Sequence, residues 1–228
     1  MEPVNEKLHN SQKRKPKNDI KFNISLNEEQ KAAKADILSH TVSLLKGQAG
    51  SGKTLLACQI ALDMFFNRQI EKIIITRPNV ASADEIGFLP GSMKEKMDPW
   101  LAPIYANLYM LYSKQVIDKM VDNQEIEIVP FAFVRGRTFV SACVIVDEAQ
   151  NVNSNQTEMI VGRLGLNSKM IFCGDTSQID LRNKKESGID FFKILESRVP
   201  GVKVIVLQQN HRHPIVPEIL NVYKEYDR

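Results

Sequence analysis

The chain has 228 residues, of which 43% are hydrophobic and 25% charged, the composition of an ordinary soluble domain with a core. The chain has 30 basic and 27 acidic residues, and residues 1–21 contain six of the basic and three of the acidic ones. Residues 22–228 therefore contain 24 basic and 24 acidic residues. Net charge therefore neither favours nor excludes a nucleic-acid partner. The absence of a signal peptide and of an apolar run of about 18 residues predicts a cytoplasmic protein with no membrane contact.

Residues 1–21 lack the apolar periodicity of a helix or strand and predict a flexible basic tail. The basic run at 13–17 could contact phosphates, but a solvated tail is the simpler interpretation. Residues 22–228 have the length of one domain. The three cysteines form no C-x-x-C pair and complete no metal set with the four histidines, so we expect buried thiols in a reducing compartment. They are Cys58, Cys143 and Cys173.

A phosphate-binding loop follows the first two predicted elements, a helix at about 26–39 and a strand at 42–45. Residues 47–54 read G-Q-A-G-S-G-K-T, and a helical pattern continues over 55–66. In such a loop, backbone N–H groups and a helix N-terminus surround an anion, the lysine reaches the β- and γ-phosphates, and the final hydroxyl binds Mg²⁺. The alternative, a glycine-rich turn without a ligand, is disfavoured by the flanking strand and helix. The expected nucleotide-binding residues are Gly47, Gln48, Ala49, Gly50, Ser51, Gly52, Lys53 and Thr54.

Further strands are predicted at 72–76, 125–129, 143–146, 170–173 and 203–207. Most are continuous β-branched or apolar runs, which are typical of strands buried on both faces, and helical segments lie between several of them. The repeated β/α pattern, with the phosphate loop after the first strand, predicts the α/β class. We expect a three-layer sandwich in which helices cover a mainly parallel sheet.

The segment 78–124 is the least regular part of the sequence. Residues 87–91 predict a turn, Pro99 and Pro103 are expected to break a helical pattern, and a helix is predicted over 105–120. Periodicity does not decide whether this segment is a structural insertion or a surface for a partner.

Two acids directly follow the strand at 143–146. In a P-loop protein, an acid at the tip of a neighbouring strand faces the Mg²⁺ of the nucleotide, and Asp147 fits this role. Glu148 fits a general base that polarises the attacking water. A metabolite kinase needs no such base, because a substrate hydroxyl is its acceptor, so the pair favours hydrolysis. A solvated acidic turn is the alternative.

Two glutamines are further candidates. Gln178 follows the strand at 170–173, where ligands of open α/β sheets bind, and it could sense hydrolysis by bonding the γ-phosphate or the water. Gln30 precedes Lys53 by 23 residues, and its amide could pair with adenine and select ATP. The alternatives are a plain loop cap for Gln178 and a solvated helix residue for Gln30.

Several motifs occur in a fixed order. L-N-x-x-Q (26–30), G-x-x-x-x-G-K-T (47–54), D-E-A-Q (147–150) and G-D-x-x-Q (174–178) resemble the nucleotide-binding half of superfamily 1 helicases. With them, T-R-P (76–78), G-F-L-P-G (87–91), R-G-R-T (135–138), G-D-T-S-Q-I-D (174–180) and R-H-P (212–214) resemble the PhoH-like family of ATPases over about residues 22–220.

The resemblance implies a RecA-like ATPase that uses ATP and Mg²⁺, is proposed to act on RNA, and is often assembled as a ring. By motif position it assigns Gln30 to the base, Lys53 and Thr54 to phosphate and Mg²⁺, Asp147 and Glu148 to metal and water, and Gln178 to sensing. Gln48 stands where a proline is common, and His211 where an aliphatic residue is usual. We expect His211 to touch no ligand-binding residue and both departures to leave these assignments standing.

A cation on the γ-phosphate accelerates phosphoryl transfer about 10³-fold or more. Two-domain helicases supply it from a second domain, but only about 50 residues follow the G-D-x-x-Q motif here. Arg212, directly after the last strand, is the first candidate, from the same subunit or a neighbour, with a plain surface arginine as the alternative. Because one domain would then hold half of a composite site, we expect a homo-oligomer, most simply a ring.

Three arginines near strand ends, Arg77, Arg135 and Arg137, could bind a nucleic-acid backbone, with structural ion pairs as the alternative. Phe131 and Phe133 alternate with small residues and are expected in the core. The prediction is an ATPase with single-stranded RNA or DNA as its candidate partner. The alternatives are an ATP-gated module that recruits a protein with little turnover and, disfavoured by Glu148, a metabolite kinase.

Overall fold

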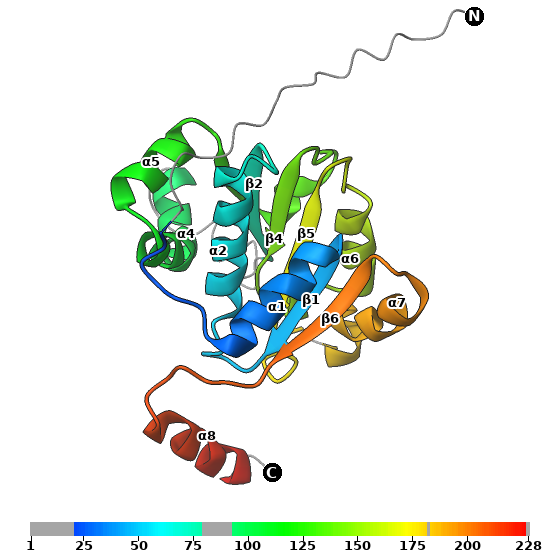
Figure 1. The fold of residues 1–228 in the computed structure, drawn as a ribbon. Coiled ribbons are helices and arrows are strands. Elements are labelled where there is room, and N and C mark those ends of the chain that lie inside the picture. The colour runs from blue at the N-terminus through cyan, green and yellow to red at the C-terminus, as the bar shows by residue number, and fades with distance from the viewer. Residues whose placement is uncertain (1–20, 79–92, 182, 227–228) are drawn as a thin grey trace, which may run out of the picture.

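The structure is a computed structural model that describes residues 21–78, 93–181 and 183–226 (Figure 1). The predicted turn at 87–91 and nearly all of the predicted tail lie outside the described residues. Six strands form one sheet in the order β3-β2-β4-β5-β1-β6, and every neighbouring pair is parallel. The strands are β1 (Val42–Gly47), β2 (Lys72–Arg77), β3 (Ile126–Pro130), β4 (Ala142–Val146), β5 (Lys169–Gly174) and β6 (Val202–Leu207).

Helices cover both faces of this sheet, which makes the predicted three-layer sandwich (Figure 1). One face is covered by α1 (Glu28–Ser39), α2 (Lys53–Phe66), α4 (Met93–Leu111) and α5 (Lys114–Asp122). The other is covered by α6 (Ser154–Val161), α7 (Phe192–Arg198) and the 3-10 turns η1 (Phe131–Val134), η2 (Ala149–Asn151) and η4 (Gly188–Phe191). The turn η3 (Lys184–Glu186) precedes η4, and α8 (Ile215–Tyr226) extends away from the sheet in Figure 1.

The central strands are buried on both faces, as their continuous apolar sequences predict. Every residue of β4 and β5 is buried, and alternate side chains enter opposite cores. All six predicted strands are confirmed to within two residues. The three cysteines are also buried, and this burial raises the pKa of each thiol, to about 12 for Cys143.

Helix α4 corrects one prediction. It runs without a break from Met93 to Leu111, through both Pro99 and Pro103, and a separate helix begins at Lys114. A proline lacks an N–H donor and normally interrupts a helix. Here the side chains of Ile104, Leu108 and Leu111 are fully buried, and α4 packs against α2. This tertiary burial outweighs the local penalty, which periodicity alone could not show.

The topology gathers functional side chains at one edge of the sheet. After β1 the chain continues into α2 on one face, whereas after β5 it continues to η4 and α7 on the other. Strands β1 and β5 are neighbours, so the crevice at their carboxyl ends is a topological switch point. The phosphate loop and the residues that follow β4 and β5 therefore lie around one space.

Candidate active site

The loop between β1 and α2 depends on its glycines. Gly50 and Gly52 have φ of +90° and +79°, a region that residues with a Cβ rarely adopt. A Cβ on Gly47 would lie 2.8 Å from the Leu207 carbonyl oxygen, so the loop passes close to β6. The Lys53 ammonium donates to the carbonyl oxygens of Gly47 (2.7 Å) and Gln48 (3.0 Å) across the loop. This closed loop at the N-terminus of α2 has the form of an anion site.

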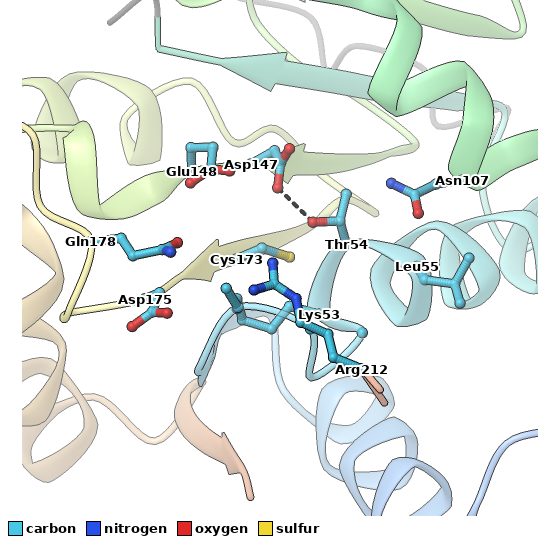
Figure 2. Close-up of a pocket in the computed structure, with 13 residues that line it drawn as sticks. Lys53, Thr54, Leu55, Asn107, Asp147, Glu148, Cys173, Asp175, Gln178 and Arg212 are labelled. Atoms are coloured by element: carbon cyan, nitrogen blue, oxygen red, sulfur yellow. Dashed lines mark hydrogen bonds between the residues drawn. The ribbon is translucent and has the colours of Figure 1, made fainter. Parts of the chain in front are cut away.

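Asp147 and Thr54 meet at the centre of the site (Figure 2). The Thr54 hydroxyl donates to Oδ1 of Asp147 at 2.6 Å, and the Asp147 residue is 7% exposed. Burial raises the pKa of the Asp147 carboxyl above its usual value, and the bond from Thr54 opposes this shift only in part. A buried carboxylate without a cation beside it is unfavourable, so this pair is suited to receive one.

Glu148 is held by two donors. Its backbone is left-handed, with φ of +50°, an uncommon conformation for a residue with a Cβ. Gln150 Nε2 donates to Glu148 Oε2 at 2.5 Å, and Arg77 Nη2 lies 3.5 Å from Oε1. The Glu148 side chain is 34% exposed, so water can reach it.

Residues after β5 form the opposite wall. Gln150 Oε1 accepts from the Asp175 backbone N–H at 3.1 Å, which ties the tip of β4 to that of β5. Asp175 Oδ1 accepts from the backbone and the hydroxyl of Ser177, whereas Gln178 is exposed at the cavity.

These groups line one open cavity of about 300 Å³. The sequence-predicted residues that it brings together are Ala49, Gly50, Gly52, Lys53, Thr54, Asp147, Glu148, Gln178 and Arg212 (Figure 2). Sequence reasoning gave no role to Leu55, Asn107, Cys173 and Asp175, which also line it. Asn107 comes from α4, and no pattern in the sequence marks it. Gln150 was also missed as a bridge, although its position in the D-E-A-Q motif was a signal for it.

Arg212 reaches this cavity within its own chain. The segment after β6 lies on the phosphate loop, where the His211 backbone N–H donates to the Gly50 carbonyl at 3.0 Å and Asn210 Nδ2 to the Ala49 carbonyl at 3.3 Å. A Cβ on Gly50 would lie 2.7 Å from Arg212 Cγ, so the arginine side chain crosses directly over the loop.

Gln30 lies beside the loop but does not line the cavity. Its backbone and side chain form a capping box with Asn27 at the start of α1, and only 7% of the residue is exposed. Its Nε2 lies 3.4 Å from His211 Nε2 and would be 3.3 Å from a Cβ on Gly52. The expectation that His211 touches no ligand-binding candidate was therefore wrong. Sequence separation of 181 residues concealed the contact.

The other arginine candidates do not share one environment. Arg137 donates to Glu127 at 2.6 Å and lies over the Phe139 ring, an arrangement expected of a structural ion pair. Arg135 is exposed.

Phe133 is 64% exposed, so its predicted core position was wrong, whereas Phe131 is buried as expected. The turn η1 replaces the extended alternation on which the prediction rested, and this turn directs the two rings differently.

The site fits Mg²⁺ bound together with a nucleotide. Among the described residues, no group of three or more His, Cys, Asp or Glu side chains could hold a metal ion. Mg²⁺ usually takes one or two protein oxygens and completes its shell with phosphates and water, which Thr54 and Asp147 allow. Within the same described part of the chain, Ser51 Oγ and Asp175 Oδ2 are buried without a hydrogen-bond partner. Such groups indicate that the protein alone does not complete the polar interactions here.

A phosphate loop between β1 and α2, on a parallel sheet between helices, defines the α/β P-loop NTPase fold. The chain is thus a nucleotide-binding P-loop protein. Residues 24–224 match the family described as PhoH-like protein, and the chain belongs to that family, as the motifs predicted.

Curated relatives agree with this assignment. A PhoH-like protein of Bacillus subtilis is 44% identical over 179 residues, 78% of this chain and 56% of its own. One of Synechocystis is 40% identical over 190 residues, 82% of this chain and 58% of its own. Protein PhoH of Escherichia coli K12 is 36% identical over 168 residues, which cover 73% of this chain and 48% of the relative. The chain spans about half the length of these relatives.

Two solved helicases show weaker similarity. The Pif1 helicase of Candida albicans has a TM-score of 0.41 and 15% identity, covering 89% of this chain and 44% of its own. Bacteroides Pif1 bound to ssDNA has a TM-score of 0.44 and 16% identity, covering 89% of this chain and 46% of its own.

In the described residues, no helix combines the length and apolarity needed to cross a membrane.

Proposed function

We propose that residues 22–228 form one ATPase domain that hydrolyses ATP with Mg²⁺. The observation that carries this proposal is the convergence of Lys53, the Thr54–Asp147 pair and Glu148 on one open cavity at the switch point of the sheet. An anion-binding loop alone would suit many nucleotide-binding proteins. An adjacent acid open to water favours hydrolysis.

Each residue then has a separate task. The backbone N–H groups of the loop bind the phosphates, and the Lys53 ammonium exchanges its two loop carbonyls for β- and γ-phosphate oxygens. Thr54 and Asp147 would hold Mg²⁺, which when bound neutralises charge that develops on the phosphates. Glu148 orients a water and accepts its proton. Arg212 balances charge on the γ-phosphate, and Gln178 senses its loss.

Variants test this proposal directly. Glu148→Gln removes the proton acceptor and keeps the shape, so it should bind ATP with wild-type affinity while turnover falls at least about 10²-fold. Lys53→Ala should weaken binding itself. Calorimetry with ATP and a phosphate-release assay separate the two effects. Turnover retained by Glu148→Gln would remove that residue from the base role.

We also propose that the ATPase acts on single-stranded RNA or DNA, an expectation that rests on the family resemblance. Several-fold stimulation of turnover by an oligonucleotide supports it, whereas a flat response favours the ATP-gated module that recruits a protein. An oligomer remains part of the proposal. It is less necessary for catalysis, because Arg212 lies at the cavity of its own chain. Mixed Arg212→Ala and Lys53→Ala subunits that recover no activity would support action within one subunit.

A further inference from the structure

A second cavity, of about 530 Å³, lies beside the first and shares two of its residues. Glu148 and Gln178 line both cavities, and the second also has Arg77, Gln150, Asn151 and Asp180 in its wall. With Ser177, the lining has seven residues, of which three carry amides and three carry charges. Arg77 is the one cation among the described lining residues, and its partner is the proposed general base.

The ion pair between Arg77 and Glu148 is weak enough for another anion to replace Glu148 as the partner of Arg77. Nη2 and Oε1 are 3.5 Å apart, and the two side chains are 25% and 34% exposed. Ion pairs this exposed are weak, because water competes for both charges. A phosphodiester offers a guanidinium two oxygens at about 2.7–2.9 Å and is a stronger partner. An anionic ligand in the second cavity can therefore draw Arg77 away from Glu148.

The surroundings favour a single-stranded polynucleotide as that ligand. The amide of Gln178 is exposed and has a donor and an acceptor that match base edges, whereas the buried amides of Gln150 and Asn151 are already hydrogen bonded to protein groups. Arg77 pairs across the sheet with Pro130, directly before η1, and η1 exposes the ring of Phe133. Exposed aromatic rings are a common feature of single-strand binding surfaces. Asp180 opposes a polyanion, although its carboxylate is hydrogen bonded by Asn151 at 3.2 Å.

We propose that Arg77 restrains the base Glu148 and that a polynucleotide phosphate in the second cavity releases it. In the free protein, Arg77 and Gln150 each engage one oxygen of the Glu148 carboxylate. Transfer of Arg77 to a phosphate frees Oε1, the oxygen that then accepts the proton from water. Polynucleotide binding thereby raises ATP turnover through one ion pair. This inference rests on the proposed ATPase function and adds how that activity is regulated.

The test is Arg77→Gln in the full chain, with Arg198→Gln on the exposed surface of α7 as the matched control. ATP turnover is measured with and without a single-stranded RNA or DNA oligonucleotide. Basal turnover of Arg77→Gln should rise about two- to fivefold, the equivalent of a weak exposed ion pair, and oligonucleotide should no longer increase it. Binding of a fluorescent oligonucleotide should weaken, with the salt slope reduced by about one. The control should match wild type in both assays.

A second variant tests the ligand without touching Glu148. Asp180→Asn removes the opposing charge and keeps the acceptor for Asn151, so oligonucleotide binding should tighten about two- to fivefold. Unchanged or lower basal turnover in Arg77→Gln would overturn the inference, as would continued stimulation of that variant. Unchanged affinity in Asp180→Asn, or no oligonucleotide binding by wild type, would also overturn it. Wild type that turns over no ATP would refute the proposed ATPase function, and wild type that binds no oligonucleotide would refute the proposed action on single-stranded RNA or DNA. The remaining failures leave both standing.

Discussion

Gly50→Ala tests how the segment after β6 is held on the phosphate loop. A Cβ at Gly50 would lie 2.7 Å from both Arg212 Cγ and Asn210 Oδ1, and the backbone there has φ of +90°. The substitution therefore has two effects, strain in the loop and overlap with the segment that brings Arg212 to the cavity. Gly136 offers a matched control. Its φ is +81°, and nothing described lies within 4 Å of its Cβ position.

The two effects have different magnitudes at the two sites. A left-handed backbone costs a residue with a Cβ about 1–2 kcal/mol, and this strain is common to both variants. Overpacking costs a further 1–3 kcal/mol or so, and only at Gly50. We expect the free energy of unfolding to fall by about 1–2 kcal/mol in Gly136→Ala and about 2–5 kcal/mol in Gly50→Ala. Arg212→Ala removes the overlapping Cγ, so in that background the effect of Gly50→Ala should shrink by about 1 kcal/mol.

Urea unfolding without nucleotide measures these differences. With an m-value of about 2 kcal/mol/M, the midpoint of Gly50→Ala should lie about 0.5–1.5 M below that of Gly136→Ala. Calorimetry should show weaker ATP binding for Gly50→Ala and wild-type affinity for Gly136→Ala. Equal midpoints for the two variants, with no coupling to Arg212, would show that the segment after β6 does not rest on the loop.

Three further predictions concern buried or paired charges. Lys169 is 8% exposed and donates to the Ile37, Leu38 and His40 carbonyls at the end of α1. Lys169→Met should therefore lower the free energy of unfolding, measured in urea, by about 2–3 kcal/mol. The control Lys193→Met, at an exposed position, should leave that free energy unchanged. Burial raises the pKa of Asp147, so Asp147→Asn should be at least as stable as wild type without Mg²⁺. The Tm of this variant should not rise when Mg²⁺ and ATP are added. A clear loss of stability without Mg²⁺ would contradict the prediction. Burial raises the pKa of Glu127, but hydrogen bonds from Lys72 and Arg137 outweigh this effect and leave the pKa below its usual 4.5. The stabilisation by the charged carboxylate is therefore present above that value and is lost as pH falls. Between about pH 5 and 3, the urea midpoint of Glu127→Gln should depend less on pH than that of wild type.

The sequence determined the strands, the phosphate loop and the family. Continuous apolar runs such as that of β4 are typical of strands buried on both faces of a sheet, and the loop is a local structure whose glycines and lysine lie within eight residues. The order of the motifs adds further information, because each follows a strand whose carboxyl end lies at the same edge. Asp147 and Glu148 are therefore candidates on the strength of their position after a strand.

Tertiary structure alone decided which distant groups meet. Arg212 crosses Gly50, His211 contacts Gln30, and Arg77 faces Glu148, although these partners are far apart in the chain. Such contacts depend on strand order and helix packing, which residue types constrain only weakly. The same reason explains the errors over α4 and Phe133, because burial of whole elements outweighed a local preference in one and a 3-10 turn replaced the extended pattern in the other.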